Sequence, residues 1–144
     1  MKKQADPRMH SSEHILNQTM VRLYDCGRCF SAHIERKKSK CDYRFDNELT
    51  ADEVHKIQSS VNHVIKSDRL VSETFVLKEE AQGLYDMHKL PEDVDGRVRI
   101  VHIGNYDACP CIGEHVSSTG EIGRFRITTT SFKDGVLRIR FKLS

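Results

Sequence analysis

The feature that most constrains this chain is a pair of short segments, far apart in the sequence, that each carry two metal-ligand side chains four residues apart. The first contains His10 and His14, and the second contains Cys111 and His115. On a helix, residues four apart share one face with Cβ atoms about 5–6 Å apart, so two such side chains can reach one ion. Three imidazoles and one thiolate form a tetrahedral donor set suited to Zn²⁺. The sequence therefore predicts a fold that brings the two segments together around zinc.

The sequence leaves two roles open for this ion. If all four side chains bind at once, the site is closed and structural. If water replaces one ligand, the bound water ionises at a pH of about 7 and becomes a nucleophile. Glu13 and Glu114 each precede a predicted ligand histidine, so either carboxylate is a candidate general base. The alternative for both is a solvated glutamate near the start of a helix.

Length and composition favour one soluble domain over residues 1–144. A chain of this length buries roughly 68–70% of its unfolded surface, which is enough for one core. No apolar run approaches the roughly 20 residues of a membrane span, and no apolar segment follows the basic N-terminus as in a signal peptide. We therefore expect a cytoplasmic protein without a membrane partner. The sequence does not predict its oligomeric state.

Periodicity and capping signals predict an α+β fold. Helices are expected over 11–24, capped by Ser11 or Ser12, and over 51–67, after a capping box formed by Thr50 and Glu53. Strands are expected over 30–36, 41–46, 70–77, 97–103, 121–130 and 136–143, with a short helix over 78–84 and a loop over 91–96. This order favours a two-layer domain in which two main helices pack on a largely antiparallel sheet.

The five cysteines are an odd number without the spacing of a disulfide framework, so metal binding and burial are the favoured roles. Cys26 and Cys29 flank a predicted turn, where packing is favoured over a redox pair or half of a zinc knuckle. Cys41 alternates with apolar residues and is expected to be buried. Cys109 is either a substitute metal ligand or a neighbour of the ligands.

Basic residues gather between the first two expected strands, and they are Arg36, Lys37, Lys38 and Lys40. A basic loop of this kind can contact the phosphates of a nucleic acid. A solvated loop is an equally good interpretation, because the formal net charge of +2 does not demand a polyanionic partner.

Several motifs resemble one known family. His10-Ser-Ser-Glu-His14 resembles the His-x-x-x-His motif that opens the editing domain shared by alanyl- and threonyl-tRNA synthetases. Cys111-Ile-Gly-Glu-His115 resembles the Cys-Gly-Gly-Thr-His of that family, and Ser118-Thr-Gly-Glu-Ile-Gly123 resembles its Asn-Thr-Gly-Glu-Ile-Gly. Weaker likenesses lie at 42–45 and 49–53. The motifs follow the family order over roughly residues 10–140.

The resemblance implies a free-standing editing protein that deacylates mischarged tRNA in trans, with Ser- or Gly-tRNA(Ala) as the expected substrate. It also implies Zn²⁺ held by the two ligand pairs. We place the substrate beside Ile112, Ser118, Thr119 and Gly120. The sequence departs from the family motif at Glu13, Ile112 and Glu114, which are positions that shape the amino-acid pocket of relatives.

Three alternatives stay open. A zinc-stabilised RNA-binding module without catalysis would use the same four ligands. A metal-dependent hydrolase could act on another small ester or amide. The string His10-x-x-Glu13-His14 also fits an inverted zincin, with a third ligand from a distant glutamate. The candidates for that ligand are Glu73, Glu79 and Glu80, and this interpretation leaves the second ligand pair without a role.

Overall fold

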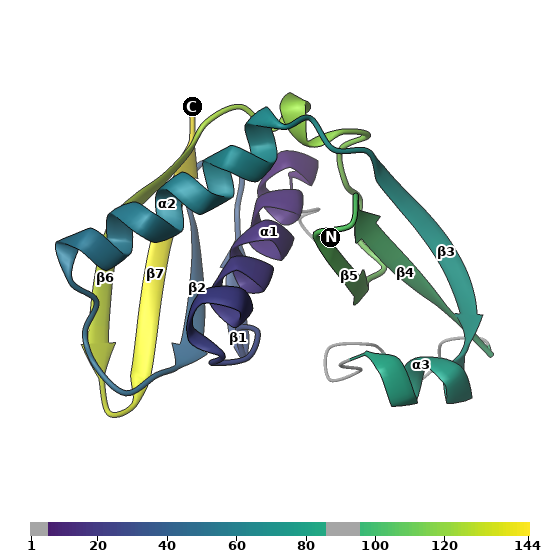
Figure 1. The fold of residues 1–144 in the computed structure, drawn as a ribbon, viewed down its shortest axis with the longest axis horizontal. Helices are drawn as coiled ribbons and strands as arrows, with labels where there is room; N and C mark the ends of the chain where they lie inside the picture. Colours follow the sequence, from purple (N-terminus) through teal and green to yellow (C-terminus); the bar gives the residue numbers. More distant parts are fainter. Residues whose placement is uncertain (1–5, 86–95) are drawn as a thin grey trace.

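The computed structural model describes residues 6–85 and 96–144, which form an α+β fold with two sheets (Figure 1). In chain order the elements are α1 (Pro7–Tyr24), β1 (Ser31–Ile34), β2 (Ser39–Arg44), α2 (Ala51–Lys66), β3 (Val71–Leu77), α3 (Lys78–Leu84), β4 (Arg97–Ile103), β5 (Asp107–Pro110), the 3₁₀ turn η1 (Thr119–Glu121), β6 (Phe125–Lys133) and β7 (Val136–Leu143). The strand orders are β1-β2-β7-β6 and β3-β4-β5, and these pairings are all antiparallel. The predicted fold class is confirmed, although the strands divide between two sheets. Of the expected loop over 91–96, only Gly96 lies within the described residues.

Helix α1 lies between the two sheets (Figure 1) and contacts α2, β1 and β5. Every residue from Ser11 to Asn17 is buried, as expected for a helix covered on most sides. The helix begins at Pro7, and the side chain of its N-cap Asp6 accepts a hydrogen bond from Arg8 N at 2.9 Å. The predicted caps Ser11 and Ser12 are therefore wrong, because proline at the first helical position and the preceding aspartate form the stronger start signal.

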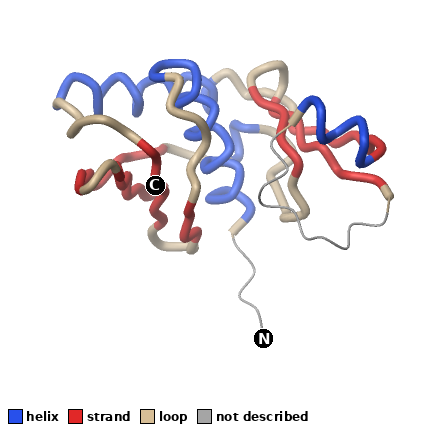
Figure 2. The backbone as a smooth tube through the Cα atoms, turned by 90° about the horizontal axis from the view of Figure 1, so that it is seen from below, coloured by secondary structure: helices blue, strands red, loops and turns tan. Residues whose placement is uncertain are grey.

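Helix α2 has the predicted capping box, in which Thr50 accepts from Glu53 N and Glu53 accepts from Thr50 N. Its apolar face packs toward the four-stranded sheet through the buried residues Ile57, Val61, Val64 and Ile65. Figure 2 shows both long helices on the same side of that sheet. The main core lies in this layer, and Tyr43, Phe125 and Phe141 are its largest buried side chains.

Several strand boundaries differ from prediction. The turn between β1 and β2 spans 35–38 instead of 37–40, so β1 ends at Ile34 and β2 begins at Ser39. The predicted strand from residue 121 begins only at Phe125, since Gly123 has a φ of +92° and η1 precedes it. The four-residue strand β5 is too short to show a period and was not predicted. It matters for function because the Cys111 loop follows directly from it.

Among the described residues, no helix combines the length and the apolar character needed to cross a bilayer.

Candidate metal centre

The structure brings the two predicted ligand pairs together. One ligand atom from each of His10, His14, Cys111 and His115 lies within 4.8 Å of the others. Cys111 Sγ is 3.4 Å from His10 Nε2 and 3.5 Å from His115 Nε2. Ligand bonds of about 2.0–2.3 Å in a tetrahedral site place neighbouring donor atoms about 3.3–3.8 Å apart. The donor set and these two separations therefore fit a tetrahedral zinc site.

Backbone and hydroxyl groups orient two of the three imidazoles. The carbonyl oxygen of Glu114 accepts a hydrogen bond from His10 Nδ1 at 3.2 Å, and this leaves Nε2 as the lone-pair nitrogen facing Cys111. Ser11 Oγ lies 2.9 Å from His115 Nδ1 and accepts a hydrogen bond from Val116 N at 3.2 Å. Both rings are thus held with Nε2 directed into the cluster.

His14 faces a carboxylate on its other side. Its Nδ1 lies 3.6 Å from Asp107 Oδ2 and has no hydrogen-bond partner among the described residues. Asp107 also accepts hydrogen bonds from Arg28 Nη1 at 2.7 Å and Gln18 Nε2 at 2.9 Å. In zinc sites, a ligand histidine commonly faces a carboxylate with its other ring nitrogen, and that contact fixes the orientation of the ring.

The charges around the cluster shift several pKa values. Burial opposes ionisation of Asp107, but its contacts with His14 and Arg28 hold its pKa at about 2. Burial opposes protonation of His14, yet the Asp107 and Cys111 contacts raise its pKa. Burial, followed by the neighbouring His14 and His10, lowers the pKa of His115 to about 2. His115 is therefore neutral at physiological pH, which is the form that binds metal.

The loop that carries Cys111 approaches α1 closely. A Cβ atom at Gly113 would lie 2.2 Å from His10 Cε1, so only glycine allows this approach. Arg99 Nη1 donates to the carbonyl oxygens of Cys111 at 3.2 Å and Gly113 at 2.7 Å. Strand β4 thereby fixes the loop against the helix.

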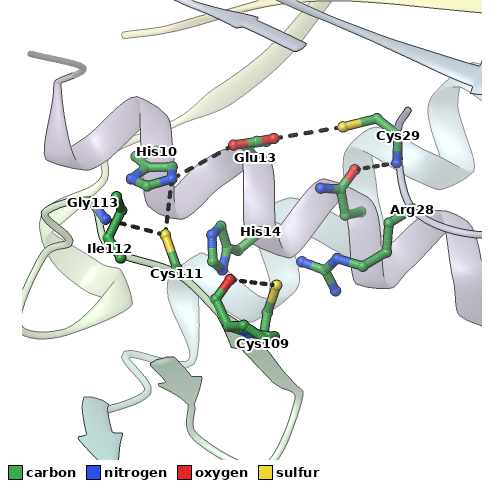
Figure 3. Close-up of a pocket in the computed structure, with 11 residues that line it drawn as sticks. His10, Glu13, His14, Arg28, Cys29, Cys109, Cys111, Ile112 and Gly113 are labelled. Carbon is green, nitrogen blue, oxygen red and sulfur yellow. Dashed lines mark hydrogen bonds and ion pairs between the residues drawn. The ribbon is translucent and has the colours of Figure 1, made fainter. Parts of the chain in front are cut away.

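The cluster borders a pocket of about 290 Å³ (Figure 3). One wall is a face of α1, a second is the turn before β1, and the third is the end of β5 with the loop after it. The lining residues are His10, Glu13, His14, Asn17, Arg28, Cys29, Cys109, Pro110, Cys111, Ile112 and Gly113. Three of the four predicted ligands thus face this pocket.

Glu13 occupies the pocket wall next to the ligands. Its side chain is 9% exposed, with Oε1 3.8 Å from His10 Nε2 and Oε2 3.5 Å from Cys29 Sγ (Figure 3). Behind it, Asn17 Oδ1 accepts from Cys29 N at 3.2 Å and from Tyr43 Oη at 2.7 Å. Glu13, Cys29 and Cys41 form a second group whose donor atoms lie within 4.8 Å of one another.

The predicted substrate residues divide into two sets. Ile112 lines the pocket and is 66% exposed. The loop from Ser118 to Gly120 does not line it. Thr119 is fully buried, and its Oγ1 donates to Val64 O at 2.9 Å and accepts from Arg69 N at 2.8 Å, so this loop holds the C-terminal end of α2.

Other predicted residues lie outside the cluster. The Glu114 side chain is not part of the pocket lining, and its contribution to the cluster is the backbone carbonyl on His10. Arg36, Lys37 and Lys38 are exposed and Lys40 is half-buried, all in the β1–β2 hairpin. None of the distant glutamates of the inverted zincin joins the donor cluster.

Sequence reasoning missed Asn17 and Arg28, which line the pocket, and Asp107, which contacts His14 and Arg28 behind it. Asn17 continues the spacing of His10 and His14 along α1, which is a signal that could have marked it. Arg28 and Asp107 are 79 residues apart in the sequence, and only the fold pairs them.

Comparison with known proteins shows which proteins the chain is similar to. Residues 98–140, which include the Cys111 loop, match the family described as the Threonyl and Alanyl tRNA synthetase second additional domain. The chain is 38% identical over 138 residues to the alanine–tRNA ligase of Cenarchaeum symbiosum, and 34% identical over 140 residues to that of Aeropyrum pernix. Each alignment covers 93% of this chain and 15% of the ligase, so the chain spans a small part of the length of these relatives.

The α+β fold is consistent with these similarities, which support an editing-type domain of the kind shared by alanyl- and threonyl-tRNA synthetases.

Proposed function

We propose that this protein hydrolyses the ester bond of mischarged aminoacyl-tRNA in trans, at a zinc ion held by His10, His14, Cys111 and His115. The observation that carries the proposal is the position of the donor cluster. It borders a pocket of about 290 Å³ instead of lying in a closed core, so a substrate carbonyl has access to it. This arrangement favours a catalytic role over a structural one.

When bound, zinc supplies a Lewis acid that polarises the ester carbonyl and lowers the pKa of water. Glu13 is the better placed of the two predicted bases, because its carboxylate lies in the pocket wall beside His10. It accepts a proton from the attacking water while the water oxygen bonds to the carbonyl carbon. The bond from that carbon to the ribose oxygen then breaks, and Glu13 returns the proton to the ribose oxygen. The products are a free amino acid and tRNA.

The pocket suits a small cationic acyl group. Its volume is at the lower end of the range for ligand pockets, which is about 300–1,000 Å³. Glu13 is the carboxylate among the residues that line the pocket, so it is the candidate partner for the α-ammonium group of an aminoacyl ester. Because the relatives are alanine–tRNA ligases, serine or glycine on tRNA(Ala) is the expected substrate.

The test is deacylation of Ser-, Gly- and Ala-tRNA(Ala) by the wild-type protein and by His14→Ala, with folding checked by circular dichroism. We expect hydrolysis of a mischarged species by the wild type and a loss of at least about 100-fold in the folded variant. Even the loss of a residue that only supports a zinc ligand typically costs about 10–100-fold in affinity or activity. Equal rates in the two proteins would contradict the proposal. Absence of turnover on every charged tRNA, with tRNA binding intact, would support the RNA-binding module instead.

A further inference from the structure

The outward face of the four-stranded sheet is strongly basic. In β7, Leu137, Ile139 and Phe141 are fully buried in the core, so the alternate residues point to the opposite face. Both long helices cover only the core side of this sheet (Figure 2). The cations at the outward positions of β2, β6 and β7 are Lys40, Arg44, Arg126, Lys133, Arg138, Arg140 and Lys142.

These cations oppose one another across neighbouring strands. Lys40 is directly opposite Arg140, and Arg126 is directly opposite Lys142. Like charges in such positions destabilise a sheet. Asp42 is the carboxylate among them, and it is bound by Arg138 through contacts of 2.8 and 3.0 Å. Within the described part of the chain, these four opposed cations form no ion pair with a carboxylate, so the face has a positive charge that an external anion would neutralise.

The same face is hollowed next to the β1–β2 hairpin. A depression of about 330 Å³ is lined by His33, Glu35, Lys38, Ser39, Lys40, Thr128, Arg140 and Lys142. At its edge, Ser39 Oγ lies 3.5 Å from Met9 Sδ. Met9 directly precedes His10, so the hollow adjoins the first turn of α1, which carries one residue of the donor cluster.

We propose that this basic sheet face, defined as Lys38, Lys40, Arg126, Arg140 and Lys142, binds the sugar–phosphate backbone of tRNA. The acceptor end then passes the hairpin to reach the pocket. The inference rests on the proposed function for its choice of RNA. Opposed rows of cations flanked by threonine hydroxyls suit phosphate oxygens.

The distribution of apolar residues separates RNA from a membrane surface. Membrane docking needs apolar side chains that enter the lipid. The large hydrophobic residues exposed in the described part of the chain are Leu70, Phe75, Leu77, Leu84 and Ile112. None of them belongs to the four-stranded sheet.

The experiment compares two double variants with the same change in net charge. Arg140→Gln with Lys142→Gln alters the basic sheet face, and Lys56→Gln with Lys66→Gln alters exposed positions on α2. The equilibrium dissociation constant for uncharged tRNA(Ala) is measured over a range of salt concentrations. For the face variant we expect binding about tenfold weaker at moderate salt, and a slope of log K against log salt reduced by about two. The α2 variant should match the wild type.

The inference would be overturned if both double variants lost tRNA affinity equally, or if the face variant lost none. It would also be overturned if the protein bound anionic vesicles but not tRNA. Deacylation separates it from the proposed function. If the function is right and the inference wrong, both variants hydrolyse charged tRNA with the wild-type KM. If the inference is right and the function wrong, the face variant loses tRNA affinity although no charged tRNA is hydrolysed by any of the proteins.

Discussion

The hydroxyl of Ser11 links helix α1 to the opposite side of the cluster. It contacts His115 Nδ1 at 2.9 Å and accepts from Val116 N at 3.2 Å. We expect Ser11→Ala to weaken zinc affinity by about 10–100-fold, because the His115 ring then loses the hydroxyl that fixes its orientation. Competition with a chromophoric chelator measures this affinity. Ser12→Ala is the matched control, since Ser12 is equally buried but bonds to Arg8 O. The same affinity in both variants would contradict the assigned role.

Thr119 has a structural role in this fold, although the family likeness suggested a substrate contact. We expect Thr119→Val to lower the free energy of unfolding by about 1–3 kcal/mol, because Arg69 N loses its buried acceptor. Urea denaturation gives this value. Thr130→Val is the control, because no hydrogen bond of its hydroxyl is found within the described residues, and it should stay within about 0.5 kcal/mol of wild type. A stable Thr119→Val protein with altered substrate preference would restore the original interpretation.

At the residue scale, the sequence predicted which side chains lie close together where their spacing along the chain decides it. His10 with His14, and Cys111 with His115, could be paired from their intervals. Asp107 could not be assigned, because its partners His14 and Arg28 lie 93 and 79 residues away in the chain, on a helix and in a turn, and no local period connects them.

Among the elements, the β2–β7 pair contains the ion pair most open to a test by pH. The hydrogen bonds from Arg138 lower the pKa of Asp42 below its ordinary value of 3.8. A carboxylate whose folded pKa is lowered stabilises the protein above its unfolded pKa, and this contribution is lost as the pH falls through the folded value.

We therefore expect the Tm difference between wild type and Asp42→Asn to be present at a pH of about 6 and to shrink below a pH of about 4. Differential scanning calorimetry over this range measures it. A difference that is constant with pH, or that grows toward acid, would show that the Asp42–Arg138 pair is not responsible.

Element prediction succeeded where the signals were local. The capping box at Thr50 and the apolar period of α2 predicted where this helix begins, and they placed its end one residue beyond the observed Lys66. The start of α1 was missed because the Asp6-Pro7 signal lies in a polar stretch before the apolar period begins. Strand β5 was missed because its four residues take their conformation from pairing with β4, which is a tertiary effect.

At the scale of the whole molecule, the four proposed ligands join the central helix to the three-stranded sheet through the loop after β5. An ion that binds only the folded protein stabilises it by about 2.7 kcal/mol at 100 times its Kd. We expect Zn²⁺ to raise the Tm of metal-free protein and a chelator to reverse the shift. His14→Ala should show a much smaller response. An equal response in the variant would place the bound metal elsewhere.

The measurement that tests the central claim most directly is a titration of metal-free protein with Zn²⁺, followed by the rate of Ser-tRNA(Ala) deacylation. The account predicts that the metal-free protein is inactive, and that its rate rises with added zinc and saturates at one equivalent. Deacylation at the full rate before any zinc is added would contradict it.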